Sequence, residues 1–214
     1  MPDVLVLLAL FSLLLAILIP IIGGGQAKSR QTQCMANLKQ ITKAVLMYTE
    51  ENQGNFPMKD QTPPTGLSFW YKEQVKAYVG LKDKSSPNDK LFACPADRGY
   101  TDPIPFWRDA RFDFNSYAYN GIVMPGIPSL AGQKITAVKD TRRTILVMEW
   151  CAHAPISWHK SRTGKHNLPF YNGAESMVGF VDGSVKFIPI YYDGINPAFS
   201  REPISGFDYH LGVD

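Results

Sequence analysis

The chain has 214 residues, of which 19% are charged and 45% hydrophobic, and its formal net charge at pH 7 is +3. This length suits a membrane anchor followed by one globular domain. The small, scattered positive charge argues against a nucleic-acid-binding surface or a polybasic lipid patch. Aromatic residues make up 12% of the chain, which argues against disorder, and 16 prolines and 17 glycines indicate a loop-rich domain.

The first 22 residues are apolar apart from Asp3 and Ser12, and they run without a loop signal into an amphipathic helical pattern that ends at about residue 52. Residues 4–22 are long enough to span a hydrocarbon core of about 30 Å as a helix. A cleaved secretory signal is a weaker interpretation, because no Lys or Arg precedes Lys28. A plain signal anchor explains the hydrophobicity but leaves Asp3 unexplained. A carboxylate there is costly, so we expect it to have a partner such as an N-terminal ammonium.

Residues that are unfavourable inside a helix cluster at the end of the apolar segment: Pro20, Gly23, Gly24 and Gly25. Proline removes a backbone donor, and each glycine costs a helix about 1 kcal/mol. We therefore predict that the helix breaks within this stretch and resumes at about Gln26. It should end near Gly54, a residue suited to a helix C-terminus, because Pro57 blocks continuation.

Apolar side chains recur on one face of the second helical half, at spacings of four, three, four and three: Cys34, Leu38, Ile41, Val45 and Tyr48. This pattern predicts a stripe that packs on the rest of the protein. The three cysteines, Cys34, Cys94 and Cys151, show no CxxC spacing. Because Cys34 lies on the stripe and Cys94 has apolar neighbours, we predict a Cys34–Cys94 disulfide with Cys151 left over. Two buried free thiols are the alternative.

In the remaining chain, an amphipathic pattern predicts a helix at residues 67–79, and an apolar, β-branched run predicts a strand at residues 144–150. Segments 177–181 and 184–188 flank Asp182-Gly183, a strong hairpin signal in which both central residues are expected to have positive φ. We predict an α+β fold in which an antiparallel sheet packs on the outer half of the long helix. Residues 1–25 would form the membrane or filament-core segment, and residues 26–214 the amphipathic helix and head.

The sequence offers little sign of catalysis. One set of metal-binding side chains falls within 16 residues, but its spacing fits no zinc pattern: Cys151, His153, His159 and His166. A Cys151–His159 nucleophilic pair would lack an orienting partner. The acidic stretch 83–113 could bind calcium, although solvated loop carboxylates are the preferred interpretation. With no hydrolase, P-loop or zinc-protease motif, we expect no enzyme, metal or cofactor.

Taken together, the sequence resembles the type IV pilin-like and pseudopilin family, with a prepilin-type N-terminal helix and a processing-associated head marked by a His followed by Asp-Gly. The resemblance rests on AILIP (16–20), CMANLKQITKAVLMYTEENQGNFP (34–57), FACPAD (92–97), SYAYNG (116–121), TILVMEW (144–150) and His166 with FVDGSV (180–185). Type IV pilins carry an early acidic residue and a downstream proline in a stretch that melts in assembled filaments. Asp3 and Pro20, 17 positions apart, match them.

The chain also departs from the family pattern. It carries Asp where the family usually has Glu, and the family's basic leader with a glycine at the cleavage point is not part of the sequence, as expected either of a mature form or of a chain without a leader. Between His166 and the Asp182-Gly183 pair lie 15 residues, where the family typically has nine. An insertion around residues 167–172 would account for the difference and would place His166 in a loop.

The resemblance implies a structural subunit of an extracellular filament, assembled as a helical homopolymer through its apolar helix. Asp3, Pro20 and the three glycines would then be assembly residues. The subunit would be anchored in the inner membrane before assembly and would meet pilus or secretion assembly machinery, with no nucleic-acid partner. A pseudopilin of a type II secretion-like periplasmic piston is one alternative. A membrane-anchored envelope binding or adhesion module that never polymerises is another.

Overall fold

The computed structural model describes residues 2–58, 69–99, 104–122, 127–150, 156–159, 174–191 and 205–213. In the first helix it describes the backbone from Pro2, and side chains at residues 4, 10–12 and from 25 onward.

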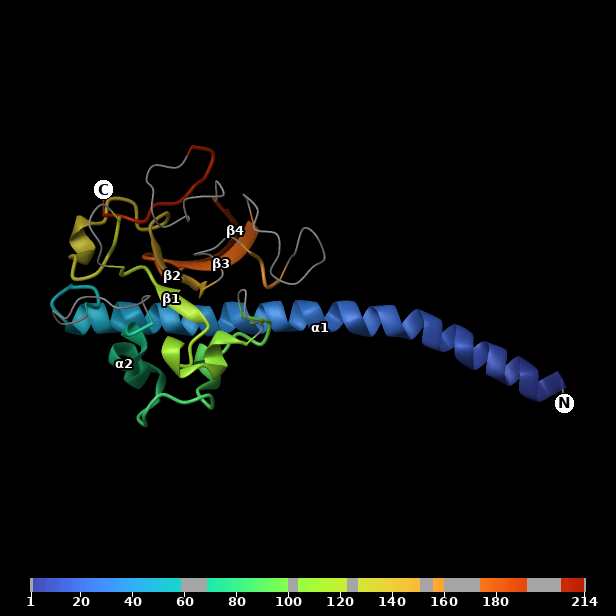
Figure 1. Cartoon of the computed structure of the whole chain (residues 1–214). Helices are drawn as coiled ribbons and strands as arrows, with labels where there is room; N and C mark the ends of the chain where they lie inside the picture. The colour runs from blue at the N-terminus through green and yellow to red at the C-terminus, as the bar shows by residue number, and fades with distance from the viewer. Residues whose placement is uncertain are drawn as a thin grey trace.

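One α-helix, α1, extends over Pro2–Glu51 and contains 50 residues. At about 1.5 Å per residue it is about 75 Å long. Figure 1 shows that it bends gently toward its N-terminus but continues without interruption. The predicted break between Pro20 and Gly25 is therefore wrong. A proline removes only one helical hydrogen bond, and once a helix is formed on both sides its propagation is cooperative, so the local cost bends the helix instead of ending it.

The C-terminus of α1 lies where the sequence predicts it. The Asn52 amide donates to the Tyr48 carbonyl at 2.9 Å, and the Gly54 amide donates to the Thr49 carbonyl at 2.9 Å. Gly54 has a φ of 79°, the left-handed conformation that commonly ends helices. Gln53 shares this conformation, with a φ of 59°, which is unusual for a residue with a Cβ atom.

A four-stranded sheet forms the centre of the head, in the order β1-β2-β3-β4. Its strands are β1 (Tyr117–Tyr119), β2 (Ile145–Glu149), β3 (Ala174–Phe180) and β4 (Val185–Ile190). All neighbouring strands pair antiparallel, as in Tyr117 opposite Glu149. This confirms an α+β fold with an antiparallel sheet. β1 was not predicted, because its three residues are too few to show the alternation of a strand.

The β3–β4 hairpin is present, but its turn differs from the prediction. The Phe180 amide donates to the Ser184 carbonyl and the Gly183 amide to the Phe180 carbonyl, both at 2.9 Å, so three residues form the loop. Of the Asp182-Gly183 pair only Gly183 has a positive φ, 84°. This is the turn in which a glycine follows a type I turn, and it needs only one left-handed residue.

The predicted helix at residues 67–79 is shorter than expected. It begins as α2 (Tyr71–Val75) and continues as a tighter 3₁₀ turn, η1 (Lys76–Val79), while residues 67–68 lie outside the described residues. Four further 3₁₀ turns occur in the described chain: η2 (Lys90–Phe92), η3 (Phe106–Arg108), η4 (Ala110–Phe112) and η5 (Ile135–Ala137).

The head encloses the second half of α1 from two sides. Figure 1 shows the sheet along one side of α1 and the segment containing α2 along the other, and α1 contacts β2, β3, β4, α2 and η2. The stripe residues Cys34, Leu38, Ile41 and Val45 are fully buried, and Tyr48 at the end of the stripe is half-buried against the same core. This confirms the predicted packing face. A second, smaller core lies on the opposite face of the sheet, where Val178 and Phe180 pack against Tyr209 and Leu211 near the C-terminus.

Candidate functional site

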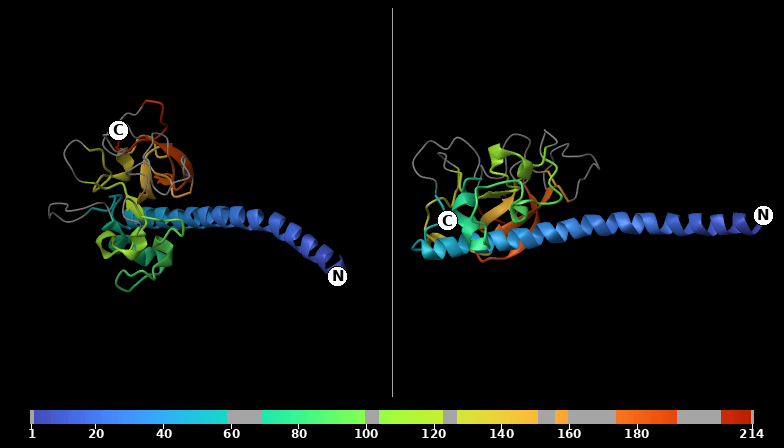
Figure 2. Two further views of the ribbon diagram at one scale, coloured as in Figure 1. Left: turned by 45° about the vertical axis from the view of Figure 1, so that its right-hand side comes forward. Right: turned by 90° about the horizontal axis from the view of Figure 1, so that it is seen from below.

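The N-terminal half of α1 projects beyond the head, as Figure 2 shows from two further directions. Large apolar side chains stand exposed on it: Val4, Leu10 and Phe11 are 60%, 58% and 61% exposed. Large apolar side chains exposed along a projecting helix favour a site for another molecule or a lipid phase. Within the described part of the chain, no helix reaches the length and apolarity needed to cross a membrane.

Most of the predicted assembly residues can be placed only by their backbone. Asp3, Pro20, Gly23 and Gly24 belong to the continuous helix, and their side-chain surroundings lie outside the described residues. At Gly25, a Cβ atom would meet nothing within 4 Å, so close packing among the described residues does not require a glycine there.

A disulfide joins α1 to the head where the helix enters it. Cys34 and Cys94 are bonded, with their Cα atoms 4.9 Å apart, although they are 60 positions apart in sequence. Both residues are fully buried. The pairing predicted from the stripe is therefore the one that the structure contains.

Hydrogen bonds reinforce the attachment beside the disulfide. Asn37, one turn farther along α1, donates from Nδ2 to the carbonyls of Lys90 and Ala93 at 3.2 and 3.0 Å. The hydroxyl of Tyr117 in β1 donates to the Cys34 carbonyl at 3.2 Å. Buried hydrogen bonds of this kind fix the register of α1 against the head, because leaving their partners unpaired would cost about 1–3 kcal/mol each.

A buried carboxylate and an imidazole lie against the disulfide. Glu149, the last residue of β2, is fully buried, and its Oε1 lies 2.7 Å from Nε2 of His159 and 3.4 Å from Sγ of Cys94. Its Oε2 accepts a hydrogen bond from the Met177 amide at 3.0 Å. The His159 side chain is 3% exposed and its ring lies edge-on to Phe187. This pairing was not predicted, because in the sequence Glu149 is simply the polar residue near the end of the apolar run TILVMEW.

Asp97 of the FACPAD motif organises the loop beyond Cys94. Its carboxylate accepts hydrogen bonds from the amides of Gly99 and Phe106 at 2.8 and 2.9 Å and from the Ser116 hydroxyl at 2.7 Å. Burial raises the pKa of Asp97 from 3.8 to about 7, although these donors oppose the shift. Ser116 also accepts from the Cys94 amide at 3.0 Å, so FACPAD and SYAYNG form one buried network beside the disulfide.

Lys72 in α2 holds together the two loops that carry Asp89 and Asp113. Its fully buried ammonium donates to the Asp113 carbonyl at 2.7 Å and pairs with Asp89 at 3.0 Å. Burial lowers the pKa of Lys72, while the hydrogen bond to Asp89 and the charge of Asp113 oppose that shift. Two members of the acidic stretch 83–113 are thus engaged with a lysine within the protein.

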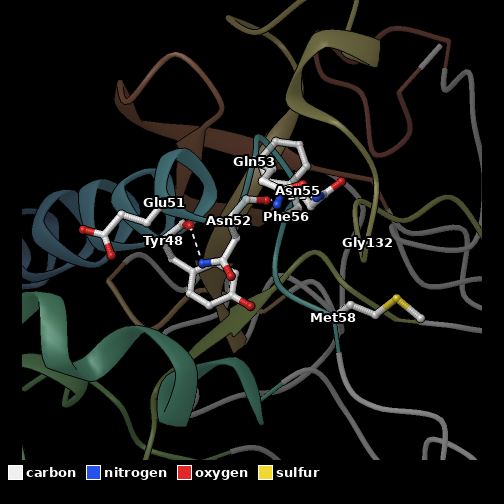
Figure 3. A pocket seen from close by; sticks show the side chains of 8 residues that line it. All are labelled: Tyr48, Glu51, Asn52, Gln53, Asn55, Phe56, Met58 and Gly132. Atoms are coloured by element: carbon white, nitrogen blue, oxygen red, sulfur yellow. Dashed lines mark hydrogen bonds between the residues drawn. The ribbon is translucent and has the colours of Figure 1, made fainter.

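A surface pocket of about 470 Å³ opens at the C-terminus of α1, lined by Tyr48, Glu51, Asn52, Gln53, Asn55, Phe56, Met58 and Gly132 (Figure 3). Several of its polar groups end the helix. The Asn52 amide group donates to the Tyr48 carbonyl at 2.7 Å, and Lys134 donates to the Gln53 carbonyl at 3.0 Å. Glu51 accepts from the Tyr78 hydroxyl at 2.6 Å. The pocket therefore has a structural explanation in the turn that ends α1.

The family-motif residues fall in two groups. Asp182 and Gly183 form the β3–β4 turn, where the Asp182 amide donates to the Thr141 carbonyl at 2.9 Å and its side chain accepts from the Ser184 amide at 2.8 Å. His166 lies outside the described residues, as do Cys151 and His153. Of the four side chains considered as a metal cluster only His159 is described, and it meets Glu149.

Comparison of the chain with protein-family models, curated proteins and solved structures finds no match.

Proposed function

We propose that this chain is the structural subunit of a type IV pilin-like filament, assembled through the apolar half of α1. The observation that carries the proposal is the division of α1 into two parts. One part is buried in the head and covalently attached to it, and the other projects with Val4, Leu10 and Phe11 exposed. A single chain gains nothing from exposing such side chains, so the projecting part is suited to a partner.

The apolar segment could serve two environments in turn. Before assembly, lipid would surround residues 4–22 and hold the subunit in the inner membrane. In a filament, identical helices would replace the lipid contacts, so the transfer would carry little cost in hydrophobic free energy. An interface that joins different surfaces of identical subunits and does not close into a ring generates a helical polymer.

Asp3 would act when a subunit enters the filament. An isolated carboxylate in an apolar bundle is strongly unfavourable, whereas a paired one is tolerated. We therefore assign to Asp3 the neutralisation of a neighbouring chain's N-terminal ammonium. Pro20 and Gly23–Gly25 lie in the same segment and would set the shape of the helix within the bundle.

The attachment of α1 to the head would transmit force along such a filament. Tension applied to the projecting part reaches the head first at Cys34, the start of the buried stripe. The Cys34–Cys94 bond would prevent the stripe from separating turn by turn from the sheet. This role is mechanical, and the proposal includes no catalytic activity, cofactor or nucleic-acid partner.

The test is to shear surface material from cells that express the chain, collect it by ultracentrifugation, and identify its protein by mass spectrometry and its form by negative-stain electron microscopy. Long fibres composed of this chain are expected. Short fibres confined to the periplasm would replace the proposal with the secretion pseudopilus. Chain found solely as unpolymerised membrane protein would overturn it in favour of an envelope binding or adhesion module.

A further inference from the structure

Four potential metal ligands converge at the junction between α1 and the head. The two sulfurs of Cys34 and Cys94, a carboxylate oxygen of Glu149 and a ring nitrogen of His159 all lie within 4.8 Å of one another. They come from four separate segments: α1, the loop after η2, the end of β2 and residues 156–159. In the structure the two sulfurs are bonded to each other.

We propose that the reduced form of this site binds one Zn²⁺ through Cys34, Cys94, His159 and Glu149. Two thiolates, an imidazole nitrogen and a carboxylate oxygen are ligands that Zn²⁺ accepts, and four of them satisfy its tetrahedral preference. The proposal is independent of filament formation, since it concerns the attachment of α1 within one chain.

The surroundings of Glu149 and His159 already resemble those of metal ligands. Oε2 of Glu149 is held by the Met177 amide at 3.0 Å, which leaves Oε1 directed at the imidazole and at the Cys94 sulfur. Nε2 of His159 lies 3.8 Å from the same sulfur. A hydrogen bond that fixes one carboxylate oxygen while the other faces the site is the arrangement by which proteins orient metal-binding side chains.

Metal binding and the disulfide exclude each other, because the metal needs both sulfurs as thiolates. A dithiol reductant transfers two electrons and two protons to the Cys34–Cys94 bond, which yields two thiols and converts the reductant to its disulfide. Zn²⁺ then binds as the two thiols release their protons. Exchange with an oxidised dithiol reverses the sequence and releases Zn²⁺. Either state fastens α1 to the head, so the metal would hold the helix in place before the disulfide forms.

The test uses the full chain in non-ionic detergent, carrying Cys151→Ser to prevent disulfide exchange with the third cysteine. The protein is reduced, freed of reductant under anaerobic conditions and titrated with Zn²⁺ against a chromophoric chelator. One Zn²⁺ per reduced chain is expected, and none for the oxidised chain. Absence of stoichiometric binding by the reduced chain, or equal binding by both forms, would overturn the proposal.

X-ray absorption at the zinc edge identifies the ligands without relying on variants that could fail to fold. Two sulfurs at about 2.3 Å and two nitrogen or oxygen ligands at about 2.0–2.2 Å are expected. A sulfur-free site would contradict the assignment. His159→Ala and Glu149→Gln should each weaken Zn²⁺ binding by more than about tenfold, while the matched controls His210→Ala and Glu175→Gln should leave it unchanged. Equal effects of ligand and control variants would also refute it.

Discussion

Gly179 of β3 lies directly against Thr42 of α1. A Cβ atom on Gly179 would overlap Oγ1 of Thr42 and would lie 3.2 Å from its Cβ. Thr42 is fully buried and its hydroxyl donates to the Leu38 carbonyl at 2.8 Å, so it is held in place. The helix can cross the sheet this closely because β3 has no side chain at that position.

Gly179→Ala is therefore expected to destabilise the head by about 1–3 kcal/mol, the usual effect of overfilling a packed core. Thr42→Ala removes the overlapping hydroxyl, and the double variant should recover part of the loss. Urea unfolding followed by tryptophan fluorescence, performed as a double-mutant cycle, measures this coupling. Strictly additive effects of the two substitutions would show that the residues do not press on each other.

The raised pKa of Asp97 gives the stability of the head a distinct pH dependence. The folded protein holds the Asp97 proton up to about pH 7, whereas the unfolded chain releases it near pH 3.8. The folded state thus binds more protons between these values, so the contribution of Asp97 to the free energy of unfolding falls as pH rises through this window and is constant above it.

Asp97→Asn should destabilise the head, because one of its oxygens is replaced by a donor that faces the donors from Gly99, Phe106 and Ser116. Asn does not titrate, so the stability difference between the variant and the wild type should be larger at pH 5 than at pH 8. Urea unfolding at both pH values measures it. A difference that is the same at both, or larger at pH 8, would contradict the burial of a protonated Asp97.

The Cys34–Cys94 disulfide closes a loop spanning 60 sequence positions. In the chain-entropy model, its removal lowers the free energy of unfolding by about 4 kcal/mol. Cys34→Ser with Cys94→Ser should show this loss, and Cys151→Ser is the matched control that should not. Denaturation is performed with a chelator so that no metal substitutes for the covalent bond. Non-reducing peptide mapping of wild-type protein checks the pairing, and a peptide linking Cys151 to either partner would refute it.

The sequence predicted much of how α1 attaches to the head but little of what surrounds the attachment. The buried face of α1 could be predicted because apolar residues that face a core recur at helical spacing, as they do at Cys34, Leu38, Ile41 and Val45. The same periodicity identified Cys34 as the half of the disulfide that faces the head. The predicted break between Pro20 and Gly25 is absent, because the helix propensity of single residues is a weak guide to the continuity of a long cooperative helix.

The contacts of Glu149, His159, Asp97 and Lys72 could not be predicted. Each depends on separate helices, strands and loops that are brought together only by folding, and no spacing pattern in the sequence records such a meeting. Glu149 and His159 are ten positions apart and lie on a strand and a loop. FACPAD and SYAYNG stood out in the sequence only as part of the family resemblance, and the structure adds that Ser116 donates a hydrogen bond to Asp97 at 2.7 Å.

Asp3→Ala is expected to reduce or abolish filament assembly while leaving the head folded, because the neighbouring ammonium would lose its partner in the apolar bundle. Glu50→Ala is the matched control, since it removes an exposed carboxylate from the opposite end of α1. Sheared fibre yield, normalised to chain in the membrane fraction, provides the measurement. Normal yield from Asp3→Ala would remove Asp3 from the assembly mechanism.

In the proposed filament, identical α1 helices bury their apolar halves against one another. Cryo-electron microscopy of the sheared fibres, with side chains resolved, would show this packing. We expect a core of α1 helices in which residues 4–22 contact neighbouring copies, with the heads on the outside and the Asp3 carboxylate beside a neighbour's N-terminus. Fibres whose subunits touch only through their heads, with the apolar half of α1 outside the core, would contradict it.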